Sequence, residues 1–189
     1  MTAYCALLRG IGPGNPNMRN DRLRGVFERL GLTDVASVIS SGNIVFTSED
    51  SDVAVLEDRI QAGLREDLDI PGGTIVRRGE DLRALVDRAP FGDLDHTKAT
   101  YLTTTFLKRP LDPAADPLPD PGDPATRLLG YDPHARAVHA VLDTTAAKTP
   151  DYMSWLERQI GKDLTTRTWL TVTRIARKLP APESSGAGS

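Results

Sequence analysis

Three short motifs, far apart in the sequence, combine arginine, glycine and small polar side chains in a pattern that suits an anionic ligand. They read LLRGIGPG at residues 7–14, SSGN at 40–43 and TRTW at 166–169. We expect each where a strand runs into a turn or a helix, and such places expose backbone N–H groups that bind anions. The motifs predict a binding site without identifying the ligand.

The first motif contains Arg9, Gly10, Gly12 and Gly14 between a predicted strand and a predicted helix. Glycines let the backbone approach a ligand closely, and the N-terminus of the following helix adds partial positive charge. The motif lacks the Gly-Lys-Ser/Thr ending of a Walker A loop and is not a dinucleotide-binding fingerprint. The alternative interpretation is a flexible connection between the two elements.

The second motif places Ser41, Gly42 and Asn43 between two predicted strands. Glycine and asparagine tolerate positive φ angles, so a tight turn explains both residues without any function. The paired serines before the turn are not explained by turn geometry. The motif therefore leaves a ligand contact and a plain hairpin turn as alternatives.

The third motif spans a strand end and a helix start, with Thr168 as the expected N-cap. Arg167 should project where the strand ends, and its planar guanidinium suits a carboxylate or phosphate. A salt bridge to one of the acidic residues is the alternative for Arg167. Trp169 either contributes to the site or packs in the core.

The remaining chemistry-bearing residues predict no metal site and no cofactor. The histidines His96, His134 and His139 lack metal-ligand spacing, and no flavin or nucleotide-cofactor motif is present. His139 lies in a predicted strand among apolar neighbours, which favours a core or surface histidine over a general base. Cys5 lies inside the first strand and is expected to be a buried structural thiol.

The first half of the chain has the element pattern of a ferredoxin-like unit. Apolar periodicity and turn residues predict strands at 4–9, 35–39, 44–47 and 74–77 and helices around 23–30 and 53–64. The order strand, helix, strand, strand, helix, strand is the split βαβ arrangement, an antiparallel sheet with helices on one face. A further helix at 82–89 closes this subdomain, expected to span residues 1–92.

A second α/β subdomain is expected over residues 93–180. Strands are predicted at 100–107, 127–131, 135–142 and 164–167, with a helix from Thr149 or Pro150 to Gly161 and a last helix ending at Pro180. The proline-rich segment 110–124 is predicted to be a long extended loop. The tail 181–189 has a disordered composition.

Composition sets the expected partners and location. The chain has 189 residues, a formal net charge of -3 and a pI near 5.6, which argues mildly against nonspecific nucleic-acid binding. A single cysteine excludes an intrachain disulfide and fits a reducing cytoplasm. No signal peptide is recognised, and no apolar run approaches the roughly 20 residues that span a bilayer. We expect a cytoplasmic protein without membrane partners; its oligomeric state is not predicted.

Read together, the motifs resemble a bacterial family of unknown function, family 1697. Its members read LLRGINVGG, then an LR-containing helix, then SGNVVF, and later Ser-Lys, Leu-Gly and T-x-RNW-x-TV. The corresponding stretches here are residues 7–15, 23–24, 41–46, 147–148, 160–161 and 165–172. The resemblance covers about residues 2–179. It implies an α+β fold of two ferredoxin-like subdomains with antiparallel sheets packed against helices, and no established activity.

The resemblance supports a functional role for Arg9, Ser41, Gly42, Asn43, Lys148, Arg167 and Trp169. Three departures reshape the expected site: Gly12-Pro13-Gly14-Asn15 replaces the family's Asn-Val-Gly-Gly, Ala147 replaces the serine before the lysine, and Thr168 replaces the asparagine of RNW. Each departure removes a polar side chain or alters a loop. We therefore expect a ligand different from that of the relatives, or the loss of an ancestral activity.

Three classes of function remain open from the sequence. The first is a small anionic ligand held in a cleft between the subdomains, bound alone or converted without a cofactor. The second is a protein-interaction or regulatory module that uses the proline-rich segment 110–124. The third, with least support, is RNA binding, because only Phe46 offers an aromatic ring on the strand after the turn.

Overall fold

The computed structural model describes residues 1–12, 14–40, 42–146 and 151–181. Its contacts divide the chain into two compact units: unit 1 is Met1–Glu80 with Ile175–Ser189, and unit 2 is Asp81–Arg174. One division falls inside helix α3 (Gly79–Asp87) and the other inside helix α5 (Trp169–Lys178). The boundary at residues 92 and 93 and the disorder of the tail stay predictions, and the tail beyond residue 181 lies outside the described residues.

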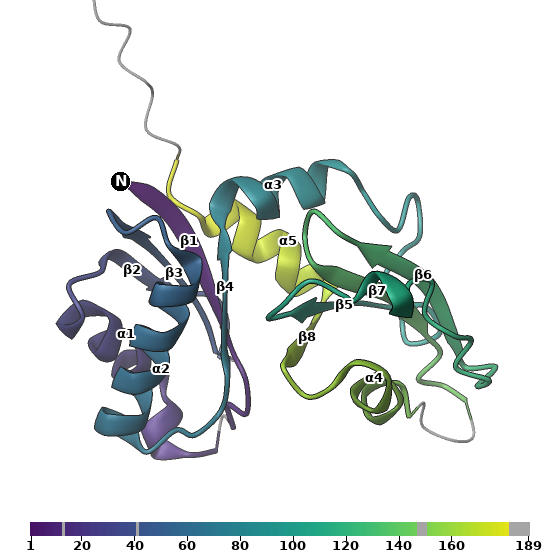
Figure 1. Cartoon of the computed structure of the whole chain (residues 1–189), viewed down its shortest axis with the longest axis horizontal. Helices are drawn as coiled ribbons and strands as arrows, with labels where there is room; N and C mark the ends of the chain where they lie inside the picture. The colour runs from purple at the N-terminus through teal and green to yellow at the C-terminus, as the bar shows by residue number, and fades with distance from the viewer. Residues whose placement is uncertain (13, 41, 147–150, 182–189) are drawn as a thin grey trace, which may run out of the picture. The chain divides into compact units, whose positions relative to one another are not determined.

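Unit 1 is a four-stranded antiparallel sheet with two helices. Its elements are β1 (Thr2–Leu8), η1 (Pro16–Met18), α1 (Asn20–Arg29), β2 (Thr33–Ser37), β3 (Asn43–Ser48), α2 (Val53–Leu68) and β4 (Thr74–Arg78). The strand order is β2-β3-β1-β4, and every neighbouring pair is antiparallel. Figure 1 shows α1 and α2 together on one face of this sheet. The predicted α+β, ferredoxin-like arrangement is confirmed.

The core of unit 1 follows from the alternation of side chains along β1. Tyr4, Ala6 and Leu8 point to the helix side, where they join the buried apolar faces of α1 and α2. The Phe46 ring lies 5.6 Å from Tyr4 and 5.5 Å from Phe27, centroid to centroid. Phe46 is therefore a core residue on the helix side of the sheet.

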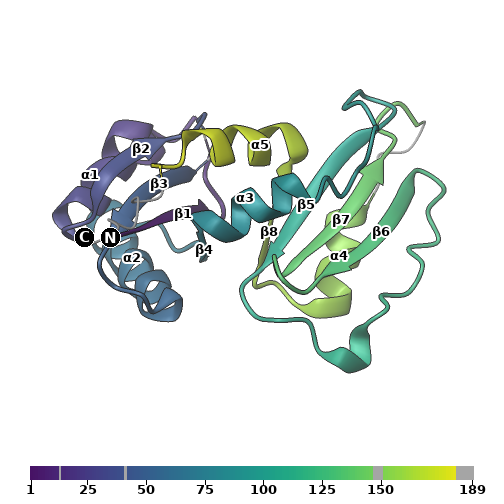
Figure 2. The same ribbon diagram turned by 90° about the horizontal axis from the view of Figure 1, so that it is seen from above.

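Unit 2 repeats the same strand order. Its strands are β5 (Tyr101–Leu107), β6 (Thr126–Asp132), β7 (Ala137–Leu142) and β8 (Leu164–Thr168), arranged β6-β7-β5-β8 in an antiparallel sheet. Helix α4 (Tyr152–Ile160) packs on one face of this sheet, as Figures 1 and 2 show. Between β5 and β6, where unit 1 has α1, unit 2 has the proline-rich segment. The cap predicted at Thr149 lies outside the described residues.

The proline-rich segment is attached to the core of unit 2. Leu111 and Leu118 are buried in the cluster that α4 covers. The Tyr131 hydroxyl accepts a hydrogen bond from the Leu111 N–H at 3.1 Å. The segment also contains one 3-10 turn, η2 (Pro113–Ala115), which the interpretation as an extended loop did not include. Proline is tolerated in the first turn of a helix, because its missing N–H has no intrahelical partner there.

The repeated topology makes two arginines equivalent. Arg77 on β4 faces Cys5 on β1, and Arg167 on β8 faces Thr104 on β5. In each case Nη1 donates to the carbonyl of the preceding residue, at 2.8 Å for Arg77 and 2.9 Å for Arg167. Each arginine thus lies one residue before the end of the last strand of its sheet, and the motif analysis identified only Arg167.

Candidate functional site

The predicted site residues are divided between the two units. Those of unit 1 are Arg9, Gly10, Gly12, Gly14, Gly42 and Asn43, and those of unit 2 are Arg167 and Trp169. Ser41 and Lys148 lie outside the described residues. The first two motifs therefore belong to one compact unit.

Three segments converge at one end of the unit 1 sheet. The Leu8 N–H donates to the Gly42 carbonyl and the Arg9 N–H donates to the Gly73 carbonyl, both at 2.8 Å. A Cβ added to Gly42, whose φ is +74°, would lie 2.5 Å from Ile11 Cγ1, and one added to Gly72 would overlap the Arg9 carbonyl oxygen. The glycine of the SSGN turn therefore allows close packing against the first loop.

The loop after β1 (residues 9–14, of which residue 13 is not described) carries backbone donors without an acceptor among the described residues. Among the described residues, the N–H groups of Gly10, Ile11 and Gly14 have no hydrogen-bond acceptor. Gly10 has φ +73°, and a Cβ added to Gly10, Gly12 or Gly14 would meet open space. A left-handed residue next to further N–H groups is the geometry of backbone anion nests. The loop can therefore accept an anion without rearranging its internal hydrogen bonds.

Asn43 has a structural role. Its side chain is fully buried, its Nδ2 donates to the Val38 carbonyl at 3.1 Å, and its own carbonyl accepts from the Val38 N–H at 2.8 Å. These bonds close the turn between β2 and β3. The sequence left a ligand contact and a plain hairpin turn as alternatives for this motif, and in the structure Asn43 closes the turn.

The start of α1 adds positive charge near this turn. Its N-cap residue, Arg19, makes no side-chain cap hydrogen bond, which leaves the first-turn N–H groups without one. Asn20 Nδ2 donates to the Ile39 carbonyl at 3.2 Å, and Arg24 Nη1 donates to Ser37 Oγ at 2.8 Å. Residues 9–24 contain four arginines and a single acid, Asp21. This stretch therefore carries a formal charge of +3, and Arg19 Nε lies 3.4 Å from Asp21 Oδ1.

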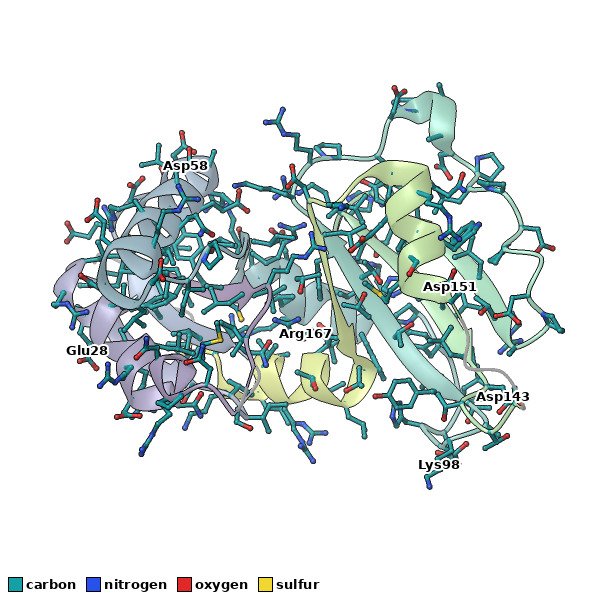
Figure 3. The ribbon with its side chains drawn as sticks, turned by 90° about the horizontal axis from the view of Figure 1, so that it is seen from below. Glu28, Asp58, Lys98, Asp143, Asp151 and Arg167 are labelled. Atoms are coloured by element: carbon teal, nitrogen blue, oxygen red, sulfur yellow. The ribbon has the colours of Figure 1, made fainter. Side chains whose placement is uncertain are left out.

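In unit 2, Arg167 and Trp169 are held by local interactions. Arg167 Nη1 donates to Thr165 Oγ1 at 2.7 Å, and Figure 3 shows the side chain beside β8. The Trp169 ring packs on Phe91 with 5.2 Å between centroids. Thr168 Oγ1 accepts from the Thr171 N–H at 3.2 Å, so the predicted N-cap is confirmed.

A buried histidine lies in the same cross-strand row as Arg167. His139 on β7 faces Thr104, and its Nδ1 shares a 3.1 Å hydrogen bond with Thr104 Oγ1. The side chain is 5% exposed, and Nε2 is buried without a hydrogen-bond partner in the described structure. The Phe91 ring lies 5.5 Å away, nearly perpendicular to the imidazole. Burial lowers the pKa of His139 to about 4, so the ring is neutral at pH 7. The core interpretation of His139 is confirmed.

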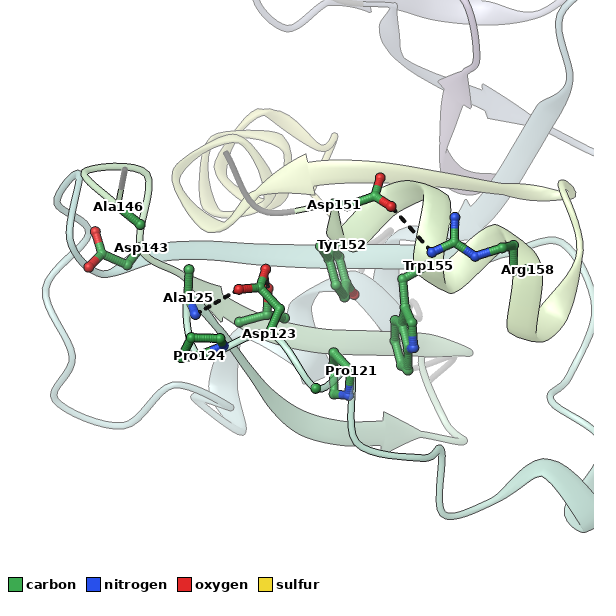
Figure 4. Close-up of a pocket in the computed structure, with 12 residues that line it drawn as sticks. Pro121, Asp123, Pro124, Ala125, Asp143, Ala146, Asp151, Tyr152, Trp155 and Arg158 are labelled. Atoms are coloured by element: carbon green, nitrogen blue, oxygen red, sulfur yellow. Dashed lines mark hydrogen bonds and ion pairs between the residues drawn. The ribbon is translucent and has the colours of Figure 1, made fainter. Parts of the chain in front are cut away.

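A cavity of about 650 Å³ lies in unit 2, and none of its described lining residues was predicted from the motifs. The described walls are the end of the proline-rich segment, the start of β6, Asp143 and Ala146 after β7, and one face of α4 with its N-cap residue Asp151 (Figure 4). No single motif marks it, because its walls come from three separated stretches. The spacing of Tyr152, Trp155 and Arg158 on α4, with Asp151 as its N-cap residue, is the local signal for the cavity.

Among residues 1–12, 14–40, 42–146 and 151–181, no group of three or more His, Cys, Asp or Glu side chains could hold a metal ion. No helix in this part of the chain is long and apolar enough to cross a membrane.

Comparison with solved structures supports the two-unit fold. A conserved bacterial protein from Streptococcus pneumoniae superposes with a TM-score of 0.67 at 24% identity, over 94% of this chain and 97% of that chain. At this identity the similarity describes the fold alone. No protein of curated function matches the sequence.

The family comparison covers the N-terminal part of the chain. A model for proteins of unknown function, DUF1697, matches residues 1–124. The matched range includes the LLRGIGPG and SSGN motifs, and it ends before Lys148 and the TRTW motif. Since the match spans well over half of the chain, this protein belongs to the DUF1697 family of proteins of unknown function.

Proposed function

We propose that this protein binds a small anionic molecule bearing a phosphate or carboxylate, and that the loop after β1 in unit 1 holds the anion. The observation that carries the proposal is the set of backbone N–H groups at Gly10, Ile11 and Gly14 without acceptors among the described residues. Backbone donors of this kind bind anions directly, and nearby guanidinium groups strengthen that binding.

The charge around the loop supports the same ligand class. Arg9 belongs to the loop, and Arg19, Arg22 and Arg24 follow within the next 15 residues, against one acid. A cofactor-independent reaction on the bound anion is the enzymatic form of this proposal, and it would use only positioning and proton transfer. Lys148, Arg167 and Trp169 stay predictions as further ligand contacts. A cytoplasmic location is part of the proposal.

The two alternatives have less support. The proline-rich segment buries Leu111 and Leu118 in unit 2, which leaves those side chains unavailable to a partner. RNA-recognition sheets stack bases on exposed aromatic rings, whereas Phe46 is buried between Tyr4 and Phe27. Both observations favour the small-ligand proposal.

Thermal unfolding in the presence of inorganic phosphate, sugar phosphates, nucleotides, carboxylic acids and acyl-CoA thioesters tests the proposal. A ligand that binds only the folded state at a hundredfold excess over its Kd adds about 2.7 kcal/mol to the free energy of unfolding. We expect at least one of these classes to raise the melting temperature of the wild-type chain.

A matched pair of variants then locates the site. Arg9→Gln should weaken the apparent affinity for the ligand at least tenfold, because it removes a positive charge from the loop. The increase in melting temperature at a given ligand concentration should therefore be smaller. Arg65→Gln removes the same charge from the exposed last turn of α2, also in unit 1, and should leave the shift unchanged. Equal losses in both variants, or no shift from any class, would contradict the proposal.

A further inference from the structure

The cavity of unit 2 has the volume of a small-molecule site. Its volume of about 650 Å³ lies within the roughly 300–1,000 Å³ that ligand pockets occupy. One wall is the N-terminal half of α4, and the facing wall is the segment 121–126 that leads into β6 (Figure 4). The cavity belongs to one compact unit, so its walls are positioned by a single sheet and helix.

The α4 wall is aromatic. The rings of Tyr152 and Trp155 lie 6.3 Å apart, centroid to centroid, and 26° from parallel. The Tyr152 hydroxyl shares a 3.2 Å hydrogen bond with Thr105 Oγ1, which fixes this ring in the core. In Figure 4, Pro121 lies near the Trp155 ring. The wall therefore offers a fixed apolar surface against which a flat or aliphatic group can pack.

The rim of the cavity is acidic. Among the described lining residues, three are acids, Asp123, Asp143 and Asp151, and one is a cation, Arg158, whose Nη2 donates to Asp151 Oδ2 at 3.2 Å. These four side chains together carry a formal charge of -2. Hydrogen bonds from the Thr145 side chain and N–H lower the pKa of Asp143. Asp143 is therefore ionised at neutral pH.

The carboxylates of Asp123 and Asp143 are held in place by the turns they cap. Asp123 Oδ1 accepts from the Ala125 N–H at 3.0 Å, and its Oδ2 accepts from the Thr126 hydroxyl at 3.1 Å. Asp143 Oδ1 accepts from the Thr145 N–H at 2.8 Å. These bonds do not neutralise the carboxylates, so the charge is preorganised at the mouth of the cavity.

We propose that this cavity binds a small organic cation, a primary amine or guanidinium attached to a flat or aliphatic body. The body would pack on Trp155, with a cation–π contribution from the indole, and the cationic head would lie among the carboxylates of Asp123 and Asp143. An anion would be repelled by the same rim. This site lies in unit 2 and is separate from the anion site proposed for unit 1, so neither depends on the other.

Benzylamine, benzyl alcohol and benzoate have similar shapes but carry a positive, a neutral and a negative head group. Comparing their affinities therefore distinguishes the effect of charge from that of ring packing. The chain has two tryptophans, so two indole N–H signals report on binding in a ¹H–¹⁵N NMR titration of the whole wild-type protein. Trp169→Phe serves only to assign them. We expect benzylamine to shift the Trp155 signal saturably and to bind at least tenfold more tightly than benzyl alcohol, with no shift from benzoate.

Charge-removing variants test the rim. In Asp123→Asn/Asp143→Asn each amide oxygen can still accept from the N–H of its turn, and the new amide NH2 at position 123 can donate to the Thr126 hydroxyl, so the charges are removed while both turns keep their hydrogen bonds. This double variant should weaken benzylamine binding at least fivefold, whereas Asp93→Asn, an exposed residue of unit 2 outside the cavity, should not. Equal affinity for benzylamine and benzyl alcohol, no shift of Trp155, or wild-type affinity in the double variant would overturn the proposal.

Discussion

At the scale of single residues, burial decides the chemistry more than residue type does. Arg77 and Arg167 occupy equivalent positions, yet Arg77 is 1% exposed while Arg167 is only half-buried. Asn43, which the motif pattern offered as a ligand contact, uses its amide to close a turn. His139 is neutral because its strand position removes it from water.

His139 gives the folded state a defined pH dependence. Its pKa is about 4 when folded, against 6.5 for the ordinary group, so the unfolded chain binds a proton first as the pH falls. The contribution of His139 to stability is fully present above pH 6.5 and is lost as the pH drops towards 4. When the pH falls from 7 to 5, we expect the titration of this group to lower the free energy of unfolding by about 2 kcal/mol.

Urea unfolding at both pH values measures this contribution. The comparison variant is His139→Gln, which keeps a hydrogen-bonding group near Thr104 and does not titrate. Its loss of stability between pH 7 and pH 5 should be smaller than that of the wild type by roughly the same 2 kcal/mol. An identical pH dependence in the two proteins would show that His139 is not the titrating group.

At the scale of elements, the contact between the loop after β1 and the β2–β3 turn shapes the proposed anion site. Gly10 and Gly42 have nearly the same φ, +73° and +74°, but only Gly42 lies against another segment, at Ile11. Comparing substitutions at the two positions therefore distinguishes backbone strain from packing. An added Cβ is equally strained at both positions, but it clashes with a neighbouring side chain only at Gly42.

The pair Gly10→Ala and Gly42→Ala measures the packing contribution. Gly10→Ala should cost about 1 kcal/mol, the usual penalty for a left-handed alanine. Gly42→Ala should cost at least about 1 kcal/mol more, because the new methyl group overlaps Ile11. Chemical denaturation compares them, and equal costs would mean that the turn and the loop are not tightly packed.

The sequence predicted the elements well and their interactions less well. Apolar periodicity located the helices around residues 23–30 and 53–64, because one face of each packs on a sheet. It could not locate the cavity, whose walls come from three segments joined only by folding. Nor could it show which N–H groups of the glycine loop lack acceptors among the described residues, since that depends on the neighbouring turn and on the segment before β4.

At the scale of the whole molecule, the chain forms two units whose sheets have the same strand order, but unit 1 is made from two stretches that are far apart in the sequence. Residues from Ile175 onward group with unit 1, at the opposite end of the chain from β1. Ile175 and Leu179 are both buried. The stability of unit 1 should therefore depend on side chains that follow the last strand of unit 2.

Ile175→Ala tests this dependence. Truncating a buried isoleucine typically costs about 2–5 kcal/mol, and here the loss should appear as faster amide hydrogen exchange in β1 and β3 of unit 1. Arg177→Ala, an exposed change on the same helix, should leave exchange in these strands unchanged. If Ile175→Ala accelerates exchange in unit 2 alone, the end of α5 does not stabilise unit 1.

The most direct test of the central claim is an NMR titration of the whole protein with inorganic phosphate, followed at the amides of Gly10, Ile11 and Gly14. We expect saturable downfield shifts of these three signals, because their N–H groups gain an acceptor, with much smaller changes near Arg65 on α2. Shifts spread evenly over the exposed arginines, or no saturable change at the three amides, would contradict an anion site at the loop after β1.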